Sequence, residues 1–427
     1  MLGWEFPPFI SGGLGTACEG LTRALARLNT EVLFVLPKAI GAEGAGRVRM
    51  AEDALHGEQH RRAMTFRAIP SALTSPYYHT GRQWEGASAP ATSGSAEAVA
   101  DPPLRLGHLC VIGAGAGGGY EGDLLGRIGD YAERCVRMTL RESFDVIHAH
   151  DWVTFPAAAA IAAQSGKPLV VQVHSTEFDR SGENVNRPVY EIERRGMHAA
   201  RSIIAVSHLT KRIIVERYGV PPEKVRVVHN GIDPKRVADP PRLDNGEKMV
   251  LFLGRLTMQK GPEFFVRAAE RVLSRLGNVR FVIAGWGDLG PQIVERVAAA
   301  GLSLKIRFAG FLRGEEVERA YRMADVYVMP SISEPFGLTA LEAIQHGVPV
   351  VISKNSGVAE VLHRGALKVD FWDVDQMADK ILAILRHPQL SEAVSRNGAD
   401  EIRPLTWDEA ARKCVGVYQE QVEALKS

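Results

Sequence analysis

The sequence predicts an α/β protein made of two Rossmann-like domains, each with a parallel β-sheet, that face each other across a cleft. The chain has 427 residues, which is too long for one ordinary hydrophobic core and suits two domains. Short apolar runs alternate with helical patterns along most of the chain, as in βαβ units. The runs are almost continuously apolar, which is typical of parallel strands covered by helices on both faces.

The first domain is predicted at residues 1–237 and begins with a segment, Met1–Phe6, that has the pattern of a strand end. A first parallel strand usually has about five residues. We therefore expect either that a few residues precede Met1 or that this strand is short. The later strands of this domain are predicted at Val32–Leu36, Val146–Ala149, Leu169–Val173 and Ile203–Val206.

The second domain is predicted at residues 246–403. It follows a segment, 230–247, that is rich in Pro, Asp, Asn and Gly and that we interpret as a linker. A helical pattern returns at residues 407–427. Helices between the strands of this domain include Pro262–Leu276 and Glu315–Met323. The strands themselves are predicted at Val250–Leu253, Arg280–Ala284, Lys305–Ala309, Val326–Met329, Val348–Ile352 and Leu367–Val369.

Composition argues against several classes of partner. Lysine plus arginine number 51 and aspartate plus glutamate 50, so the formal net charge of +1 gives no reason to expect nucleic acid or an anionic membrane. No apolar run reaches the ~18–20 residues of a membrane span, and the N-terminus lacks the pattern of a signal peptide. The four cysteines form no CxxC pair, so we expect neither disulfides nor a zinc site, and a cytoplasmic location fits best.

One glycine run resembles a dinucleotide-binding motif. Gly113, Gly115 and Gly118 match GxGxxG behind an apparent strand. Such a site requires an acidic residue about 20 positions later at the tip of a second strand, but that position falls within the helical pattern Tyr131–Leu140. The neighbouring residues 86–103 are small, polar and proline-containing. We therefore favour a flexible glycine loop over a nicotinamide or flavin site, and expect no cofactor.

A second glycine segment, Gly12-Gly-Leu-Gly15, lies between the first strand and a helix predicted at Glu19–Leu28. Glycine lets backbone N–H groups approach an oxyanion, and the dipole of the helix favours negative charge there. Gly12, Gly13 and Gly15 are therefore candidate residues for binding an anion. A plain turn between strand and helix explains this segment equally well when it is taken alone.

The segment from Asp145 to Trp152, DVIHAHDW, is a predicted buried strand that ends in polar residues. Ligands bind at the carboxyl ends of strands in open parallel sheets. His148 and His150 share one face of the strand because they are two residues apart. We expect His150 to reach the cleft and His148 to be a packed core histidine. A metal at this pair is disfavoured because no third ligand is evident.

The segment GRLTMQKG, from Gly254 to Gly261, follows a predicted strand and precedes a helix. Arg255 and Lys260 lie on either side of the turn. Two cations beside a helix N-terminus can bind a diphosphate. The alternative is a basic turn that is merely solvated.

The segment EPFGLTALE places two glutamates, Glu334 and Glu342, eight residues apart. A glycine marks the turn into a helix, so Glu334 lies in the loop and Glu342 one to two turns into the helix, where it could accept hydrogen bonds from ribose hydroxyls. Backbone N–H groups at Gly337, Leu338 and Thr339 would face a phosphate. A capped surface helix does not explain the proline and glycine in this apolar setting.

One Asp-x-Asp sequence, at Asp373 and Asp375, would be consistent with a metal-dependent transferase. It precedes the helical pattern Gln376–Leu385, where aspartates cap the helix and complement its dipole. We interpret the pair as a helix cap and expect no metal site.

Taken together and in this order, these motifs resemble those of the retaining GT-B glycosyltransferases, the family 4/5-like group that includes bacterial glycogen and starch synthases. The glutamates match its E-x7-E motif, GRLTMQKG its phosphate segment, GGLG its glycine loop and HAHDW its histidine segment, while VSHLTKRII and VVHNGID are similar to its run into the linker. The resemblance covers nearly the whole chain except residues 40–125.

The resemblance implies a role for each candidate residue. Arg255 and Lys260 would bind the donor diphosphate and stabilise it as a leaving group. Glu334 would contact the hydroxyls of the transferred sugar, Glu342 would hold the ribose, and His150 would hydrogen-bond the sugar near C6. Glycines of the GGLG loop would bring backbone to the phosphate or sugar, and the C-terminal helix would pack back on the first domain.

The resemblance also implies transfer of glucose, with retention and without a metal, from ADP-glucose or UDP-glucose to a saccharide such as an α-glucan. The GGLG loop departs from the lysine-containing pattern of the glucan synthases, because Phe9-Ile-Ser precedes it and no lysine is nearby. A transferase that makes a disaccharide or a cell-envelope saccharide is therefore an alternative. A non-catalytic sugar-nucleotide-binding protein is another, whereas a GT-B epimerase or phosphorylase finds no support.

Overall fold

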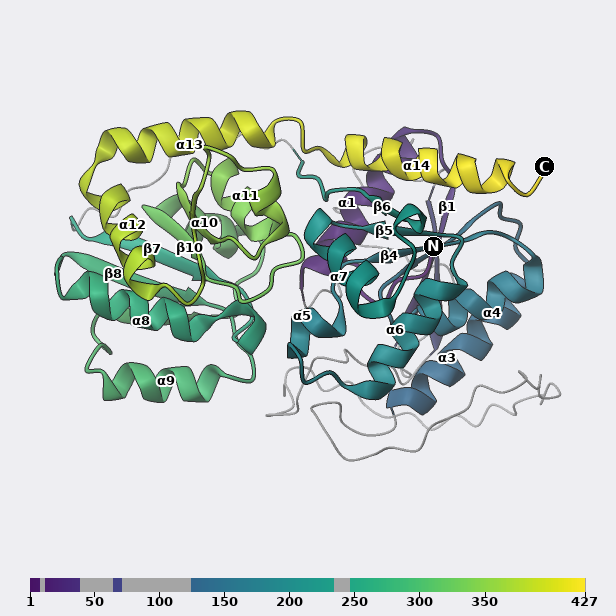
Figure 1. The fold of residues 1–427 in the computed structure, drawn as a ribbon, viewed down its shortest axis with the longest axis horizontal. Coiled ribbons are helices and arrows are strands. Elements are labelled where there is room, and N and C mark those ends of the chain that lie inside the picture. The colour runs from purple at the N-terminus through teal and green to yellow at the C-terminus, as the bar shows by residue number, and fades with distance from the viewer. Residues whose placement is uncertain (8–11, 39–63, 71–123, 234–245, 427) are drawn as a thin grey trace, which may run out of the picture.

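A computed structural model describes residues 1–7, 12–38, 64–70, 124–233 and 246–426 of the chain. Figure 1 shows two α/β bodies side by side. The first half of the chain forms one of them, and the second half, apart from its last helix, forms the other. The GxGxxG-like run, residues 86–103 and most of the predicted linker lie outside the described residues. In the part of the chain that is described, no helix is long and apolar enough to cross a membrane.

The first domain contains parallel strands in the order β2-β1 and β3-β4-β5-β6. Leu2 joins these two groups, because it forms parallel bridges to Val35 of β1 and to Ala149 of β3. The predicted first strand is thus reduced to a bridge in the middle of the sheet. The strands are β1 (Val32–Lys38), β2 (Met64–Pro70), β3 (Ile147–His150), β4 (Leu169–Val173), β5 (Ser202–Ala205) and β6 (Val225–Val227).

Helices cover both faces of this sheet, as expected for strands that are apolar on both sides. The residues of β3, β4 and β5 are all buried. The helices are α1 (Gly13–Arg27), α3 (Leu124–Thr139), α4 (Phe155–Ser165), α5 (Glu177–Ser181), α6 (Arg187–Ala199), α7 (His208–Tyr218) and the 3-10 turn η2 (Pro222–Lys224).

The second domain contains one six-stranded parallel sheet with the order β12-β11-β10-β7-β8-β9. Its strands are β7 (Lys248–Leu253), β8 (Val279–Ala284), β9 (Ile306–Gly310), β10 (Val326–Met329), β11 (Val350–Ser353) and β12 (Leu367–Val369). Its helices are η3 (Met258–Lys260), α8 (Pro262–Leu273), α9 (Gly290–Ala299), α10 (Glu315–Met323), α11 (Leu338–Gln345), η4 (Gly357–Glu360), α12 (Val374–Arg386) and α13 (Pro388–Ile402).

The Asp-x-Asp sequence caps helix α12, as predicted. The Asp373 carboxylate accepts a hydrogen bond from the Gln376 N–H at 2.9 Å. Asp375 lies in the first turn and pairs with Arg271 of α8 at 2.9 Å. Both carboxylates therefore have structural partners.

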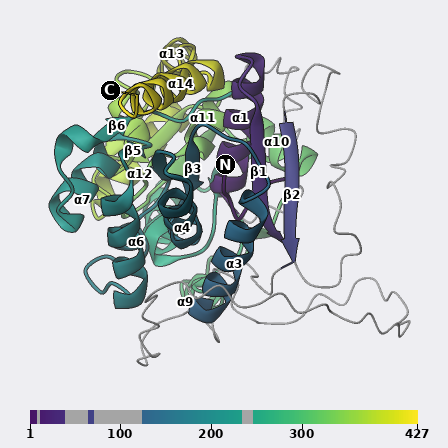
Figure 2. The same cartoon turned by 90° about the vertical axis from the view of Figure 1, so that its right-hand side faces the viewer.

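The last helix, α14 (Trp407–Glu423), returns to the first domain and packs against α1 (Figures 1 and 2). Gly20 of α1 makes room for the Trp407 indole, since a Cβ at Gly20 would lie 2.2 Å from that ring. Arg27 pairs with Asp408 at 2.6 Å. The Tyr418 hydroxyl lies 2.7 Å from Nδ1 of His148 in β3.

The two domains also touch directly beside the linker. The Glu360 carboxylate of the second domain accepts hydrogen bonds from the N–H groups of His208 at 2.9 Å and Leu209 at 2.6 Å, at the start of α7. Its other partner is His229, whose Nε2 lies 3.2 Å away. On the far side of the interface, the Ser333 hydroxyl donates to Asp179 at 2.5 Å.

Candidate active site

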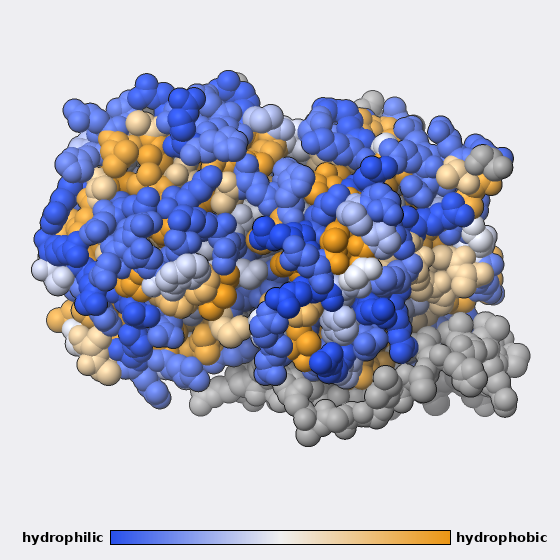
Figure 3. Space-filling model, in the orientation of Figure 1, coloured by the Kyte–Doolittle hydropathy of each residue, from blue (hydrophilic) through white to orange (hydrophobic). Residues whose placement is uncertain are grey.

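A cleft of about 680 Å³ lies between the two domains. The first domain contributes the start of α1 and the residues that follow β3 and β4. The second contributes the ends of β7, β8 and β9 and the start of α11. The face of the molecule in Figure 3 is mostly hydrophilic, with small hydrophobic patches scattered over it. The cleft lies at the carboxyl ends of parallel strands, where ligands bind in sheets of this kind.

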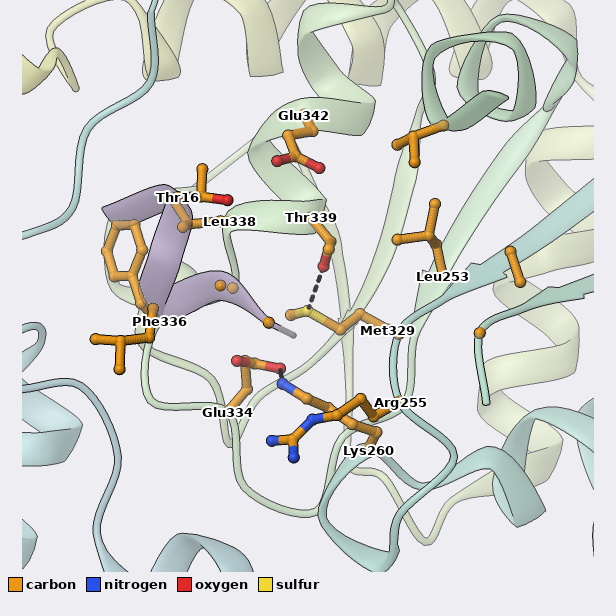
Figure 4. Close-up of a pocket in the computed structure, with 18 of the residues that line it drawn as sticks. Thr16, Leu253, Arg255, Lys260, Met329, Glu334, Phe336, Leu338, Thr339 and Glu342 are labelled. Carbon is orange, nitrogen blue, oxygen red and sulfur yellow. Dashed lines mark hydrogen bonds and ion pairs between the residues drawn. The ribbon is translucent and has the colours of Figure 1, made fainter. Parts of the chain in front are cut away.

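The turn after β7 brings Lys260 to Glu334. Gly261 ends η3 with φ of +64°, and a Cβ there would lie 2.3 Å from the carbonyl oxygen of Pro330. Only glycine allows this close approach, which packs the turn against the loop that carries Glu334. The Lys260 ammonium donates to Glu334 Oε2 at 2.6 Å (Figure 4), and the Ser331 hydroxyl donates to the same oxygen at 3.3 Å.

Arg255 and Lys260 come from the same turn and both line the cleft. Figure 4 shows their side chains together, with the Glu334 carboxylate beside the Lys260 ammonium. The Lys260 side chain is 23% exposed and that of Glu334 is 9% exposed. This wall of the cleft therefore brings together two cations and one carboxylate, and the Lys260 and Glu334 side chains are largely shielded from solvent.

Helix α11 begins at the same place. Gly337 precedes it with φ of +111°, and a Cβ there would lie 3.0 Å from Val358. No side chain caps this helix start. Gly337, Leu338 and Thr339 all line the cleft, as does Arg255. The positive end of the helix dipole therefore faces the cleft, which favours an anion there.

Glu342 and Thr339 are held by two buried tyrosines of the second domain. Tyr321 donates to Glu342 Oε2 at 2.9 Å, and Tyr327 donates to the Thr339 hydroxyl at 2.7 Å. Burial raises the pKa of both phenols, and the nearby Glu342 carboxylate raises that of Tyr321 further. Both tyrosines therefore stay hydrogen-bond donors at neutral pH and orient the groups that they hold.

The structure does not place His150 in the wall of the cleft, contrary to the expectation from the sequence. His150 is fully buried, and its Nδ1 lies 3.0 Å from Nε2 of His174. His174 lines the cleft instead. It follows β4, so the rule that ligands bind at strand ends applied to it as well. His148 is a packed core histidine that contacts Tyr418, as predicted.

Asp151 connects the ends of β3 and β4. Its φ of +59° is unusual for a residue other than glycine. Its carboxylate accepts hydrogen bonds from the N–H groups of His174 at 2.7 Å and Ser175 at 3.4 Å. Burial raises the pKa of Asp151 to about 7 and lowers that of His174 to about 3. The cleft thus contains a neutral imidazole beside a carboxyl that titrates near neutral pH.

The glycine loop faces the start of α11 across the cleft. Gly12 and Gly13 line the cleft, and a Cβ at Gly13 would lie 3.9 Å from Leu338. Gly15 is buried, and its N–H donates to Glu5 Oε2 at 3.3 Å. The Gly15 N–H therefore donates to a carboxylate of the chain, whereas the resemblance implies that the backbone of this loop contacts the phosphate or sugar.

Among the described residues, no group of three or more His, Cys, Asp or Glu side chains is arranged to hold a metal ion. Sequence reasoning also missed Arg180, which lines the cleft from α5. Nothing in the local pattern around Arg180 marks it as a cleft residue.

Two family models match the chain, and the boundary between their matches lies between the two sheets. Residues 107–236 match the model of Glycosyltransferase Family 4, and residues 235–401 match the model of Glycosyl transferases group 1.

Relatives extend this likeness to the full length. The chain is 28% identical to an uncharacterized glycosyltransferase of Methanocaldococcus jannaschii, over 100% of the chain and 98% of the relative. It is 27% identical to the glycogen synthase of Mycobacterium tuberculosis, over 98% and 93%. It is 31% identical to the D-inositol 3-phosphate glycosyltransferase of Acidothermus cellulolyticus, over 65% and 67%.

Solved structures share the fold. Sucrose-phosphate synthase from Thermosynechococcus elongatus superposes with a TM-score of 0.73 at 17% identity, covering 99% of this chain and 98% of that one. HepE of Anabaena, solved with UDP and glucose, gives a TM-score of 0.67 at 17% identity, with 98% of each chain covered. The chain therefore belongs to the GT-B glycosyltransferases of the family 4/5-like group that includes the bacterial glycogen synthases.

Proposed function

We propose that the chain is a retaining hexosyltransferase that moves glucose from ADP-glucose or UDP-glucose to a saccharide acceptor, with an α-glucan as the first acceptor to test. The observation that carries the proposal is the Lys260–Glu334 contact of 2.6 Å between the cationic turn and the loop that precedes α11. This contact supports the proposal because it brings an ammonium and a carboxylate together in the cleft. The ammonium would stabilise the charge on a leaving diphosphate, and the carboxylate would hold a hexose by its hydroxyls.

The donor would lie along the wall formed by the second domain. Arg255, Lys260 and the first turn of α11 would surround the diphosphate. As the bond to the sugar breaks, negative charge grows on the leaving phosphate. Cations and N–H groups that are already in position stabilise that charge more in the transition state than in the ground state. Glu342, which Tyr321 holds by a hydrogen bond of 2.9 Å, would accept hydrogen bonds from the ribose.

Retention and independence of metal are further parts of the proposal. Two side-chain cations and a helix N-terminus offer compensating charge for a diphosphate. In a front-face displacement, the acceptor oxygen would bond to the anomeric carbon while the bond to the diphosphate breaks. The leaving phosphate oxygen would take the acceptor proton. Activity that a chelator abolishes and magnesium or manganese restores would contradict the proposed metal independence.

The proposed acceptor rests on similarity to a relative. The glycogen synthase of M. tuberculosis is similar over almost the whole chain, which favours an α-glucan. The alternative is a transferase that makes a disaccharide or a cell-envelope saccharide. A non-catalytic sugar-nucleotide-binding protein is the candidate from a different class. A cytoplasmic location stays a prediction from the cysteine content.

A screen of donors and acceptors tests the proposal. Release of nucleoside diphosphate would be measured from ADP-, UDP- and GDP-sugars, with and without glycogen, maltose or glucose. Release from ADP-glucose or UDP-glucose that rises with glycogen supports an α-glucan synthase. Release that responds only to a small sugar supports the alternative acceptor. Donor binding without turnover on any acceptor would instead identify a binding protein.

A further inference from the structure

The described residues of the first domain that line the cleft include fewer cations than those of the second domain. Among these residues, which form the first-domain wall of the cleft, the ionisable side chains are Glu5, Asp151, His174 and Arg180. His174 is neutral, because burial lowers its pKa to about 3. Arg180 is thus the one cation that the described part of this domain presents to the cleft. Whether it can attract an anionic acceptor depends on the groups around it.

Arg180 is already paired with two carboxylates. Its Nε donates to Glu177 at 3.0 Å and its Nη2 donates to Glu193 at 2.5 Å. The three side chains are 9%, 0% and 1% exposed, respectively. Glu193 also accepts hydrogen bonds from the Glu177 N–H and from the Tyr218 hydroxyl. The group is therefore a closed buried network rather than a cation held out toward the cleft.

The network of Arg180, Glu177 and Glu193 has no net positive charge, whether Glu193 is ionised or protonated. Burial raises the pKa of Glu193, while Arg180 opposes that shift. With Glu193 ionised, one guanidinium faces two carboxylates and the sum is negative. With Glu193 protonated, Arg180 and Glu177 cancel. In both states an anionic ligand meets no net positive charge here.

The N-terminus of α1 is the second feature of this wall that could attract an anion, but a carboxylate of the chain already lies there. Glu5 is buried, lines the cleft and accepts the Gly15 N–H at 3.3 Å. A carboxylate at this place satisfies a backbone donor of the first turn and complements the helix dipole. A phosphate brought to the same helix end would have to approach that carboxylate.

We propose, on the basis of the proposed function, that this enzyme transfers its sugar to an uncharged saccharide and discriminates against phosphorylated sugars and phosphorylated polyols. The second domain lines the cleft with three cations and three carboxylates, which balance formally: Arg255, Lys260 and Arg313, and Glu318, Glu334 and Glu342. The described part of the first-domain wall offers carboxylates, a neutral imidazole and one guanidinium that is already paired. Such groups can accept and donate hydrogen bonds to sugar hydroxyls, whereas like charges brought together across an interface suppress the wrong partner.

Matched acceptor pairs test the proposal with the wild-type protein. Transfer would be measured with glucose against glucose 6-phosphate, maltose against maltose 1-phosphate, and inositol against inositol 3-phosphate. We expect kcat/KM for the better neutral acceptors to exceed that of their phosphorylated counterparts by about tenfold or more. An equal or higher kcat/KM for the phosphorylated members overturns the inference while leaving the glycosyltransferase intact. Absence of diphosphate release with every donor and acceptor would instead contradict the proposed function itself.

Glu5→Gln tests the cause. Removing this charge should raise the ratio of kcat/KM for phosphorylated over neutral acceptor by about tenfold, even if total activity falls. Glu183→Gln is the matched control, because Glu183 lies in the same domain and pairs with Arg217 on the surface with a 76% exposed side chain. An unchanged ratio in folded Glu5→Gln, confirmed by circular dichroism, overturns the role of this carboxylate. The wild-type pairs decide the acceptor class if this variant does not fold.

Discussion

Replacement of Lys260 by alanine is the most informative single change. The side chain lies between the cationic turn and the E-x7-E segment, and its ammonium donates to Glu334 at 2.6 Å. The change removes one charge from the proposed diphosphate site. It also deprives the Glu334 carboxylate, in a side chain only 9% exposed, of its ammonium partner and leaves the Ser331 hydroxyl donating to it at 3.3 Å.

Both effects have an expected size. Loss of one hydrogen-bond donor that is held in position to stabilise charge developing in the transition state typically lowers kcat by about 10²–10³-fold. Exposed ion pairs contribute about 0.2–1 kcal/mol, whereas breaking a buried pair costs about 3–5 kcal/mol. Because Lys260 is 23% exposed, the loss of unfolding free energy should fall between these limits, at about 1–3 kcal/mol.

Steady-state kinetics and chemical denaturation separate the two effects. Lys354→Ala is the matched control, since Lys354 lies in the same domain and pairs with Asp370 at 2.7 Å on the surface. The double variant Lys260→Ala with Glu334→Gln should recover part of the stability but not the kcat, because it removes the unpaired carboxylate and does not restore the cation. A Lys260→Ala protein with wild-type kcat would refute the assignment.

Three further predictions follow from single contacts. Glu342→Gln should raise the donor KM about tenfold with little change in kcat, because a hydrogen bond to the ribose serves the ground and transition states alike; steady-state kinetics checks this. Gly261→Ala should lower the unfolding free energy by about 2 kcal/mol or more, since its φ is +64° and a Cβ would lie 2.3 Å from the carbonyl of Pro330; denaturation with urea measures it. Asp151 has a folded pKa of about 7 against an ordinary value of 3.8, so the folded state binds the extra proton between these values and loses stability as pH rises. Asp151→Asn should weaken that loss, and an identical pH dependence of the denaturation midpoint in both proteins would contradict the reasoning.

The sequence predicted the fold well because the central strands of both sheets are buried on both faces, which gives them almost continuous apolar runs. Leu169–Val173, Val326–Met329 and Leu367–Val369 have the bounds that the structure gives them. Strand β2, at Met64–Pro70, and the three-residue strand β6, at Val225–Val227, were missed. The β6 segment is too short for a clear periodic pattern. It forms a strand because it pairs with β5, which is not adjacent to it in the sequence.

The sequence also predicted the residues of the donor side, which is the wall of the cleft formed by the second domain. Lys260, Glu334 and the start of α11 converge because the strands before them are parallel and end at the same edge. The acceptor side was predicted less well. His150 occupies the last position of a strand whose residues are all buried, so His174 rather than His150 reaches the cleft. The engagement of Arg180 with Glu193 and of Glu5 with Gly15 depends on tertiary contacts that no local pattern encodes.

The most direct test of the central claim is the fate of a labelled sugar. Purified protein would receive ADP-glucose or UDP-glucose with a carbon label in the glucosyl group, together with maltooligosaccharide and glucose, and the products would be followed by NMR. We predict that the label appears in a new α-glycosidic linkage as nucleoside diphosphate is released. A β-linked product would contradict retention, and label that stays in the donor or appears only as free glucose would contradict the transferase assignment for these substrates.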